Sequence, residues 1–320
     1  MPSPNSTFSE IVTTTLRKHP DEVADNVSDH NALYRRLKAK GNIKKLDGGY
    51  KIVRPLDYAE NATYQRYAGA DTLNIAASDV LSAAEYDWCQ AAIHVTATGR
   101  DLRMNSGESQ IIDLAQARLK NAIRTAANNM SVDLFSSGAL TNQIGGLAAQ
   151  VTNDGTGTVG GIVSGTHTFW KNQFFECTSG PSASNIQGFM NSLYLLCTRG
   201  TDVPDLIVSS QDMYNYYWSS LQAPQRFTDS NDMARAGFPS LKYVTSDIIF
   251  DVNSNFSTTA KKMYFLNTDY IEMCVHKAAN WTQMDEKFST NQDAEVIPLF
   301  FMGNLVCSNR SLQGVLKDES

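Results

Sequence analysis

The most regular pattern in the chain lies between Glu108 and Ser137, a stretch without glycine or proline. Apolar residues recur there at a mean spacing of about 3.7, which matches the helical period. They are Ile112, Ala115, Leu119, Ile123, Ala126, Met130 and Leu134. Ser106 is a candidate N-cap, and Gly138 is a candidate helix terminator. The pattern predicts a helix over residues 108–137, about 40 Å long, which we expect to act as the spine of the fold.

A second pattern is the strict alternation of residues from 87 to 95. One set of alternate positions holds Cys89, Ala91, Ile93 and Val95. Such alternation predicts a half-buried strand with that set facing the core. His94 lies on the other face and has no partner at metal-ligand spacing, so we expect it to be structural.

Shorter apolar segments predict the other elements. Helices are expected over residues 6–16, 31–40, 182–196 and 212–221. Strands are expected over residues 205–209, 243–245, 263–266 and 271–276, with a final group over 295–316. Helices and strands alternate at first and strands then follow one another, which predicts an α+β fold with a mixed sheet.

Apolar positions are sparse from residue 42 to 73. Asp47-Gly48 is typical of a hairpin turn, residues 51–54 read as a strand, and Pro55 marks its end or a sheet edge. A long hairpin with so few apolar residues cannot stabilise itself. We therefore expect it to lie on another body, such as a neighbouring copy of the chain. Its aromatic residues are Tyr58, Tyr64 and Tyr67.

The charge is acidic on average but basic near the start. The chain of 320 residues has 27 Lys and Arg against 33 Asp and Glu, a formal net charge of −6, which argues against nucleic-acid binding over its whole surface. Basic residues cluster between 35 and 54 against one acid, Asp47; they are Arg35, Arg36, Lys38, Lys40, Lys44, Lys45, Lys51 and Arg54. Two interpretations stay open, a solvated surface or an arm that contacts an acidic partner.

The cysteines and the apolar runs limit the possible classes of protein. Cys89, Cys177, Cys197, Cys274 and Cys307 are scattered and form no Cys-x-x-Cys pair, so we expect buried thiols in a reducing compartment. No apolar run approaches the about 20 residues of a membrane span. The first residues lack a basic region followed by an apolar run, so we expect no secretory signal.

Gly155-Thr156-Gly157-Thr158-Val159-Gly160 matches the G-x-G-x-x-G string of dinucleotide-binding proteins. That motif needs a strand before the glycines, a helix after them and an acidic residue about 20 positions on. None of these is indicated here, so a loop is favoured and a dinucleotide-dependent oxidoreductase remains a remote alternative. No other catalytic or metal-ligand spacing occurs, and we predict no enzyme activity, no cofactor and no metal.

The order of these features resembles the major capsid protein of tailed bacteriophages, whose Hong Kong 97-type fold is shared with encapsulin shells. Two groups of short sequence motifs strengthen the resemblance. The first follows the long helix and comprises Ile144-Gly145-Gly146-Leu147, residues 157–162 and Phe169-Trp170-Lys171-Asn172. The second lies at residues 303–310 and 312–316.

The resemblance implies a division of the chain. Residues 1–41 would form an N-terminal arm, and 42–75 an extended loop that crosses a neighbouring subunit. Residues 76–145 and 291–320, with the spine helix at about 108–137, would form a peripheral domain. Residues 146–290, beginning with a glycine-rich segment at 145–168, would form an axial domain with a mixed sheet.

The resemblance also implies a function. The chain would be a structural protein that assembles with itself, as pentamers and hexamers, into an icosahedral shell around double-stranded phage DNA. It would be made in the host bacterial cytoplasm and located in the virion, with no membrane contact. Portal and decoration proteins would be further partners, and a separate protein would supply any scaffolding because the arm is short. An encapsulin-like compartment is the alternative.

Residue roles are expected by region. The eight basic residues from Arg35 to Arg54 would contact neighbouring subunits or DNA, and the three tyrosines would pack the loop on a neighbour. Some members of the family crosslink a lysine to an asparagine. Lys44, Lys45 and Lys51 lie in the right region, but no matching asparagine or catalytic glutamate is identified, so we predict no crosslink.

Overall fold

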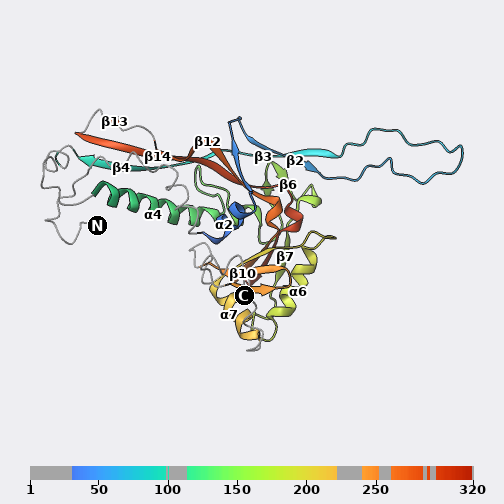
Figure 1. Cartoon of the computed structure of the whole chain (residues 1–320). Coiled ribbons are helices and arrows are strands. Elements are labelled where there is room, and N and C mark those ends of the chain that lie inside the picture. The colour runs from blue at the N-terminus through green and yellow to red at the C-terminus, as the bar shows by residue number, and fades with distance from the viewer. Residues whose placement is uncertain are drawn as a thin grey trace.

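The computed structural model describes residues 31–98, 100, 114–221, 240–251, 261–283, 287–288 and 293–318. A long sheet with a helix along it occupies one side, a second sheet with two helices lies below, and a narrow loop projects from the body (Figure 1). The α+β class with mixed sheets agrees with the sequence prediction. The helix predicted over 6–16 lies outside the described residues.

The five-stranded sheet is built around strand β14 (Ala294–Cys307). Strand β4 (Cys89–Thr98) pairs antiparallel with one edge of β14, while β12 (Ile271–Gln283) and the short β13 (Lys287–Phe288) pair with the other edge. Strand β1 (Ile43–Leu46) adds in parallel to β12. The alternation predicted from residue 87 is confirmed in β4, where Cys89 and Val95 are buried and Gln90 and His94 are exposed.

Helix α4 (Leu114–Leu134) runs along this sheet and confirms the described part of the predicted spine (Figure 1). Residues 101–113, including the candidate cap Ser106, lie outside the described residues. Ala122 packs with Val95 of β4 and Ile297 of β14. Gly138 follows the helix with φ +68°, a backbone conformation that glycine adopts without strain.

The six-stranded sheet has the order β7, β15, β11, β8, β10, β9. Its strands are β7 (Gln173–Glu176), β8 (Leu206–Ser209), β9 (Ser240–Tyr243), β10 (Ser246–Phe250), β11 (Lys261–Leu266) and β15 (Gly314–Asp318). Helices α6 (Ile186–Leu196) and α7 (Gln211–Ser220) cover one face. The other face joins the main core, so β8 is buried on both faces, as its continuous apolar run predicts.

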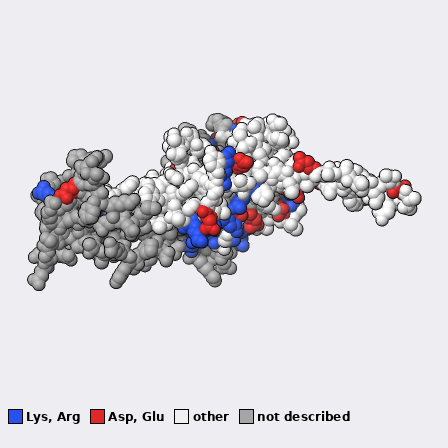
Figure 2. Space-filling view, turned by 90° about the horizontal axis from the view of Figure 1, so that it is seen from above, with Lys and Arg blue, Asp and Glu red and all other residues white. Residues whose placement is uncertain are grey.

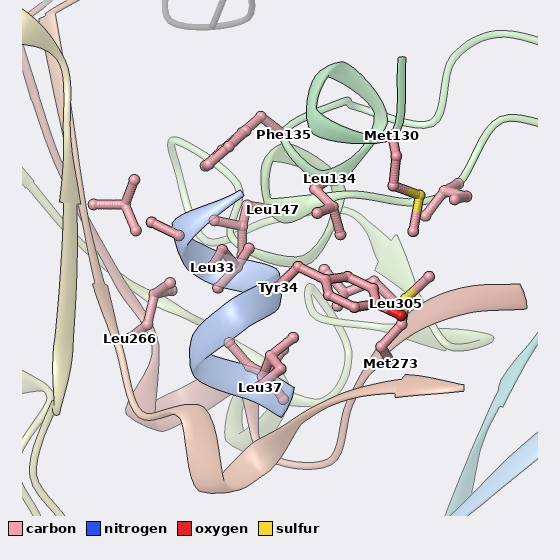
Figure 3. Packing of buried hydrophobic residues seen from close by; sticks show 14 of the residues in the cluster. Leu33, Tyr34, Leu37, Met130, Leu134, Phe135, Leu147, Leu266, Met273 and Leu305 are labelled. Carbon is pink, nitrogen blue, oxygen red and sulfur yellow. The ribbon is translucent and has the colours of Figure 1, made fainter. Parts of the chain in front are cut away.

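Helix α2 (Ala32–Ala39) lies in the main core, between the end of α4 and the strands of both sheets (Figure 3). Leu33 and Leu37 are fully buried there. The Asn31 side chain caps the helix by accepting a 3.0 Å hydrogen bond from the Tyr34 N–H. A cap at one end and a buried apolar face explain why so short a helix is stable. Short connectors complete the fold; they are α5 (Leu147–Gln150), η2 (Thr168–Trp170), η4 (Thr268–Tyr270) and η5 (Arg310–Leu312).

The hairpin differs from the sequence prediction. Its strands are β2 (Ile52–Asp57) and β3 (Leu81–Tyr86), so it lies later in the chain than residues 42–75. Asp47-Gly48 does not turn one hairpin strand into the other, because β1 before it pairs with β12 instead. Pro55 lies within β2, and a two-stranded ribbon tolerates it because each strand has one free edge.

Strand pairing crosses the boundaries of the expected division of the chain, which stays a prediction. Strand β12 falls within 146–290, yet it pairs with β14 in the five-stranded sheet. Strand β15 falls within 291–320, yet it pairs with β7 and β11 in the six-stranded sheet. From β11 to β15 the chain therefore passes from the six-stranded sheet to the five-stranded sheet and back again.

Candidate functional site

The projecting loop, residues 58–80, joins β2 to β3 and extends away from the rest of the molecule (Figure 1). Its arms are joined next to the strands by one backbone bond, from the Tyr58 N–H to the Val80 carbonyl at 3.1 Å. Further out, side chains link the arms. The Gln65 amide donates to the Thr72 carbonyl at 3.2 Å, and the Ala62 N–H donates to the Ser78 hydroxyl at 3.1 Å. The arms thus form a ribbon that lacks a regular backbone ladder.

Large apolar side chains on this ribbon are exposed. Tyr64 is 82% exposed and Ile75 is 93% exposed. The others are Tyr67 and Leu73, and Leu81 at the start of β3 is exposed beside them. Single exposed apolar residues are common, but a group of them on a thin projection has no core to join and is typical of an interaction surface.

The projecting loop carries little charge. It contains Glu60, Asp71 and Asp79 against Arg66, so its formal charge is 1 − 3 = −2. Figure 2 shows a mostly uncharged projection and a body on which acidic and basic side chains lie intermixed. Apolar contact, more than charge pairing, is what this loop offers to a partner.

The base of the hairpin is fixed to the body. Arg54 of β2 forms a 2.5 Å ion pair with Glu272 of β12 and donates to the Cys274 sulfur at 3.0 Å. The Tyr86 hydroxyl of β3 donates to the Cys307 carbonyl at 2.8 Å, and burial raises the pKa of that phenol. The projection is therefore held firmly at its root.

The three predicted tyrosines have different surroundings. The Tyr58 ring stacks on Phe169 of the same chain, with ring centroids 5.2 Å apart. Tyr64 and Tyr67 are exposed. Tyr58 thus belongs to the root of the loop, while the other two are available to a partner.

Arg36 of α2 and Lys40, the residue that follows the helix as its C-cap, bind acids of the same chain. Arg36 Nε donates to Asp205 Oδ2 at 3.1 Å, and Lys40 Nζ lies 3.1 Å from the same oxygen and 2.7 Å from Asp269 Oδ1. Asp205 also accepts from the N–H and hydroxyl of Thr268, both at 2.7 Å. These contacts fasten α2 to the six-stranded sheet.

The remaining basic residues are closer to the surface. Lys51 pairs with Glu85 across the hairpin at 3.1 Å, and this pairing raises the pKa of Lys51. The Lys44 amine donates to the Gly41 carbonyl at 3.2 Å. Arg35 is half-buried, and the side chains of Lys38 and Lys45 are exposed. The predicted basic region is thus divided between internal ion pairs and surface charge.

The G-x-G-x-x-G string forms no dinucleotide loop. Strands β5 (Thr158–Val159) and β6 (Ile162–Val163) form a small hairpin around Gly160 and Gly161. A phosphate-binding fingerprint requires a helix to begin at the glycines, because helix N–H groups hold the pyrophosphate. Here a strand follows instead, which removes the basis of the oxidoreductase alternative.

The cysteines, the metal-ligating residue types and the helices complete the description of these residues. All five cysteines are buried and free, as the sequence predicts. Within the described ranges, no three His, Cys, Asp or Glu side chains gather as a metal site. No helix there is both long and apolar enough to cross a membrane.

Sequence reasoning missed the apolar residues in the second arm of the loop and the acidic partners of the basic residues. Leu73 and Ile75 stand two positions apart in a polar stretch, and this local alternation was the available signal. Asp205 lies 169 residues from Arg36, and no local pattern could connect the two.

No family model matches the chain, and no curated protein does. Among solved structures, it is similar to the "Cyanophage A-1(L) capsid asymmetric unit", with a TM-score of 0.61 and 15% identity over 86% of this chain and 89% of that one. The capsid of a native GTA particle has a TM-score of 0.60 and 11% identity, with 99% of this chain and 95% of that one covered. The holo-SrpI encapsulin complex from Synechococcus elongatus PCC 7942 has a TM-score of 0.50 and 10% identity, with 89% of this chain and 88% of that one covered.

These similarities extend over nearly the whole of each chain. At identities of 10–15% they show a shared fold. The chain has the Hong Kong 97-type fold of these capsid and encapsulin structures, as its sequence resemblance predicts.

Proposed function

We propose that the protein is a structural capsid subunit that assembles with copies of itself into a closed icosahedral shell around double-stranded phage DNA. The observation that carries this proposal is the projecting loop, whose exposed Tyr64, Tyr67 and Ile75 have no core of their own. A repeated subunit can bury such a surface on its neighbour, because every copy supplies both the loop and the surface that receives it.

The manner of contact follows from the ribbon. Its outer arms lack a backbone ladder, so N–H and C=O groups there can pair with an acceptor subunit, while the apolar side chains bury area. The exposed Lys38 and Lys45 would face a neighbour or the packaged DNA, whereas Arg36, Lys40 and Arg54 stabilise the subunit itself.

The division of labour within the shell is part of the proposal. The loop would cross an adjacent subunit, the six-stranded sheet with α6 and α7 would form the lobe near the symmetry axes, and α4 with the five-stranded sheet would form the peripheral wall. The subunit would reside in the virion, have no enzymatic activity and form no covalent crosslink.

Electron microscopy of the purified full-length protein tests this proposal. We expect pentamers, hexamers or closed particles tens of nanometres across, and a monomer that persists at high concentration would contradict it. A ladder of covalent multimers on a denaturing gel would contradict the absence of crosslinks.

An encapsulin-like compartment is the second candidate, favoured by the similarity to the SrpI complex. The two candidates share the shell and differ in the cargo. Particles recovered from cells that carry the complete source genome should protect double-stranded DNA from added nuclease if the first is right. Particles that instead enclose a protein and no DNA would support the second.

A further inference from the structure

The glycine-rich segment that contains the G-x-G-x-x-G match at residues 155–160 continues into a small hairpin with a defined place in the fold. Its small hairpin, β5 and β6, lies at the root of the projecting loop (Figure 1). Gly160 and Gly161 connect the two strands with φ +59° and +74°. Positive φ at both positions is what a two-residue turn of type I′ requires, and glycine adopts it without strain.

The turn contacts β3 directly. The Glu85 N–H donates to the Gly160 carbonyl at 2.9 Å, so the outer edge of β3 gains one bond from the turn. A Cβ at Gly160 would lie 2.8 Å from the Ala84 Cβ and 3.1 Å from the Tyr86 ring. Glycine at 160 is therefore required for close approach as well as for its φ value.

Gly161 provides a contrast within the same turn. It shares the positive φ, yet a Cβ there would meet nothing within 4 Å. Replacement of either glycine by alanine would strain the backbone, but only replacement of Gly160 would also place a Cβ against β3. Comparing the two variants therefore separates the effect of strain from the effect of the contact with β3.

The other side of the small hairpin is tied into the body. The Trp170 indole N–H donates to the Val159 carbonyl at 2.9 Å, and Trp170 is buried. The Arg310 guanidinium in turn donates to the Trp170 carbonyl at 3.1 Å and to the Ser164 hydroxyl at 2.9 Å. An unbroken series of contacts runs from β3 through the turn to the closing segment of the chain.

We propose that residues 158–170 form a brace that fixes the projecting hairpin to the body and sets the direction in which the loop extends. Val159 and Trp170 belong to the same buried cluster as Ile52 and Tyr86 of the hairpin, and the Gly160 carbonyl accepts the hydrogen bond from β3. Phe169 supports the first residue of the loop by stacking on Tyr58. The use of this direction in shell assembly rests on the function proposed above.

Hydrogen exchange on the unassembled full-length chain tests the brace. In Gly160→Ala we expect the amides of β3 to exchange about tenfold faster than in the wild type, because the hairpin root opens locally. In Gly161→Ala the same amides should stay within about twofold of the wild type. Strand β10, which four strand positions separate from β7 in the six-stranded sheet, reports any global loss of stability in both variants.

Equal acceleration in the two variants would overturn the brace, since backbone strain alone would explain it. If Gly160→Ala does not fold, Trp170→Phe gives the second measurement, because it removes the hydrogen bond to Val159 and keeps an aromatic ring. The matched control is Trp218→Phe on α7. Faster β3 exchange in Trp170→Phe alone supports the brace, and unchanged exchange overturns it.

Particle formation by the wild type is recorded separately. A chain that forms no particles but shows accelerated β3 exchange only in Gly160→Ala would contradict the proposed function and leave the brace supported. A chain that forms particles but shows no difference between the two glycine variants would support the proposed function and contradict the brace.

Discussion

Arg310 shows how a single residue organises this fold. Its side chain is fully buried and donates to Gln150 O at 2.7 Å and to Asn172 Oδ1 at 2.8 Å, besides its bonds to Ser164 and Trp170. Burial lowers the pKa of the guanidinium, and its hydrogen-bond partners here are all neutral oxygens. Trp170 and Asn172 belong to the first group of sequence motifs that carry the family resemblance, and Arg310 belongs to the second. The two groups therefore meet at this side chain.

Replacement of Arg310 by leucine should strongly destabilise the subunit. The change leaves the buried oxygens of Gln150, Ser164 and Trp170 without a donor, whereas Asn172 Oδ1 keeps its bonds from Thr152. Each unsatisfied group costs on the order of 1 kcal/mol or more. We expect the free energy of unfolding to fall by about 3–5 kcal/mol, measured by urea denaturation. The control is Arg124→Leu on the exposed side of α4, and equal losses in the two variants would contradict the role of Arg310.

The buried thiols predict how stability depends on pH. Burial raises the pKa of Cys177, Cys197 and Cys307 to about 12 from an ordinary value near 8.5. Above pH 9 the unfolded chain loses these protons and the folded chain keeps them, so stability must fall as pH rises from about 9 to 12. Denaturation midpoints measured across that range should decrease steadily, and a midpoint that rises would contradict the assignment.

Elements with a regular apolar period were predictable from the sequence, and elements that depend on remote partners were not. Helix α4 and strand β4 are recognised because the apolar spacing of each repeats within its own length. Strand β3 was missed because its buried positions are Ala84 and Tyr86, and Ala84 is buried against Gly160 far along the chain. Similarly, the exposure of Tyr64 and Tyr67 agrees with their expected place on a contact surface, which stays a prediction, whereas the internal role of Arg36 depends on distant Asp205.

Helix α2 gives a prediction at the scale of an element. Arg36 pairs with Asp205, whereas Arg35 is half-buried and has no ion pair within the described part of the chain. Arg36→Glu should lower the free energy of unfolding of the isolated subunit by about 1–2 kcal/mol, because it places a third carboxylate beside Asp205 and Asp247. Thermal denaturation measures the effect. Arg35→Glu, the matched control, should change stability by less than about 0.5 kcal/mol, and the same loss in both would show that the ion pair is not responsible.

At the scale of the whole molecule, the proposed function assigns stability and assembly to different parts of the chain. The cores around α2, α4, α6 and α7 lie in the body, and the exposed apolar residues of the projecting loop contribute to none of them. The loop can thus be changed without loss of the fold, provided that its root stays intact. This separation makes assembly testable independently of folding.

The double substitution Tyr64→Ser with Ile75→Ser should abolish particle formation while leaving the melting temperature of the subunit within about 1 °C of the wild type. Both side chains are largely exposed in the single chain, so folding loses almost nothing, whereas an interface loses two large apolar contacts. Light scattering and electron microscopy measure assembly, and Tyr64→Phe with Ile75→Val, which keeps the apolar surface, should still form particles. Particles of normal yield from the serine variant would show that the loop is not the assembly surface, and a melting temperature several degrees lower would show that these side chains support the fold itself.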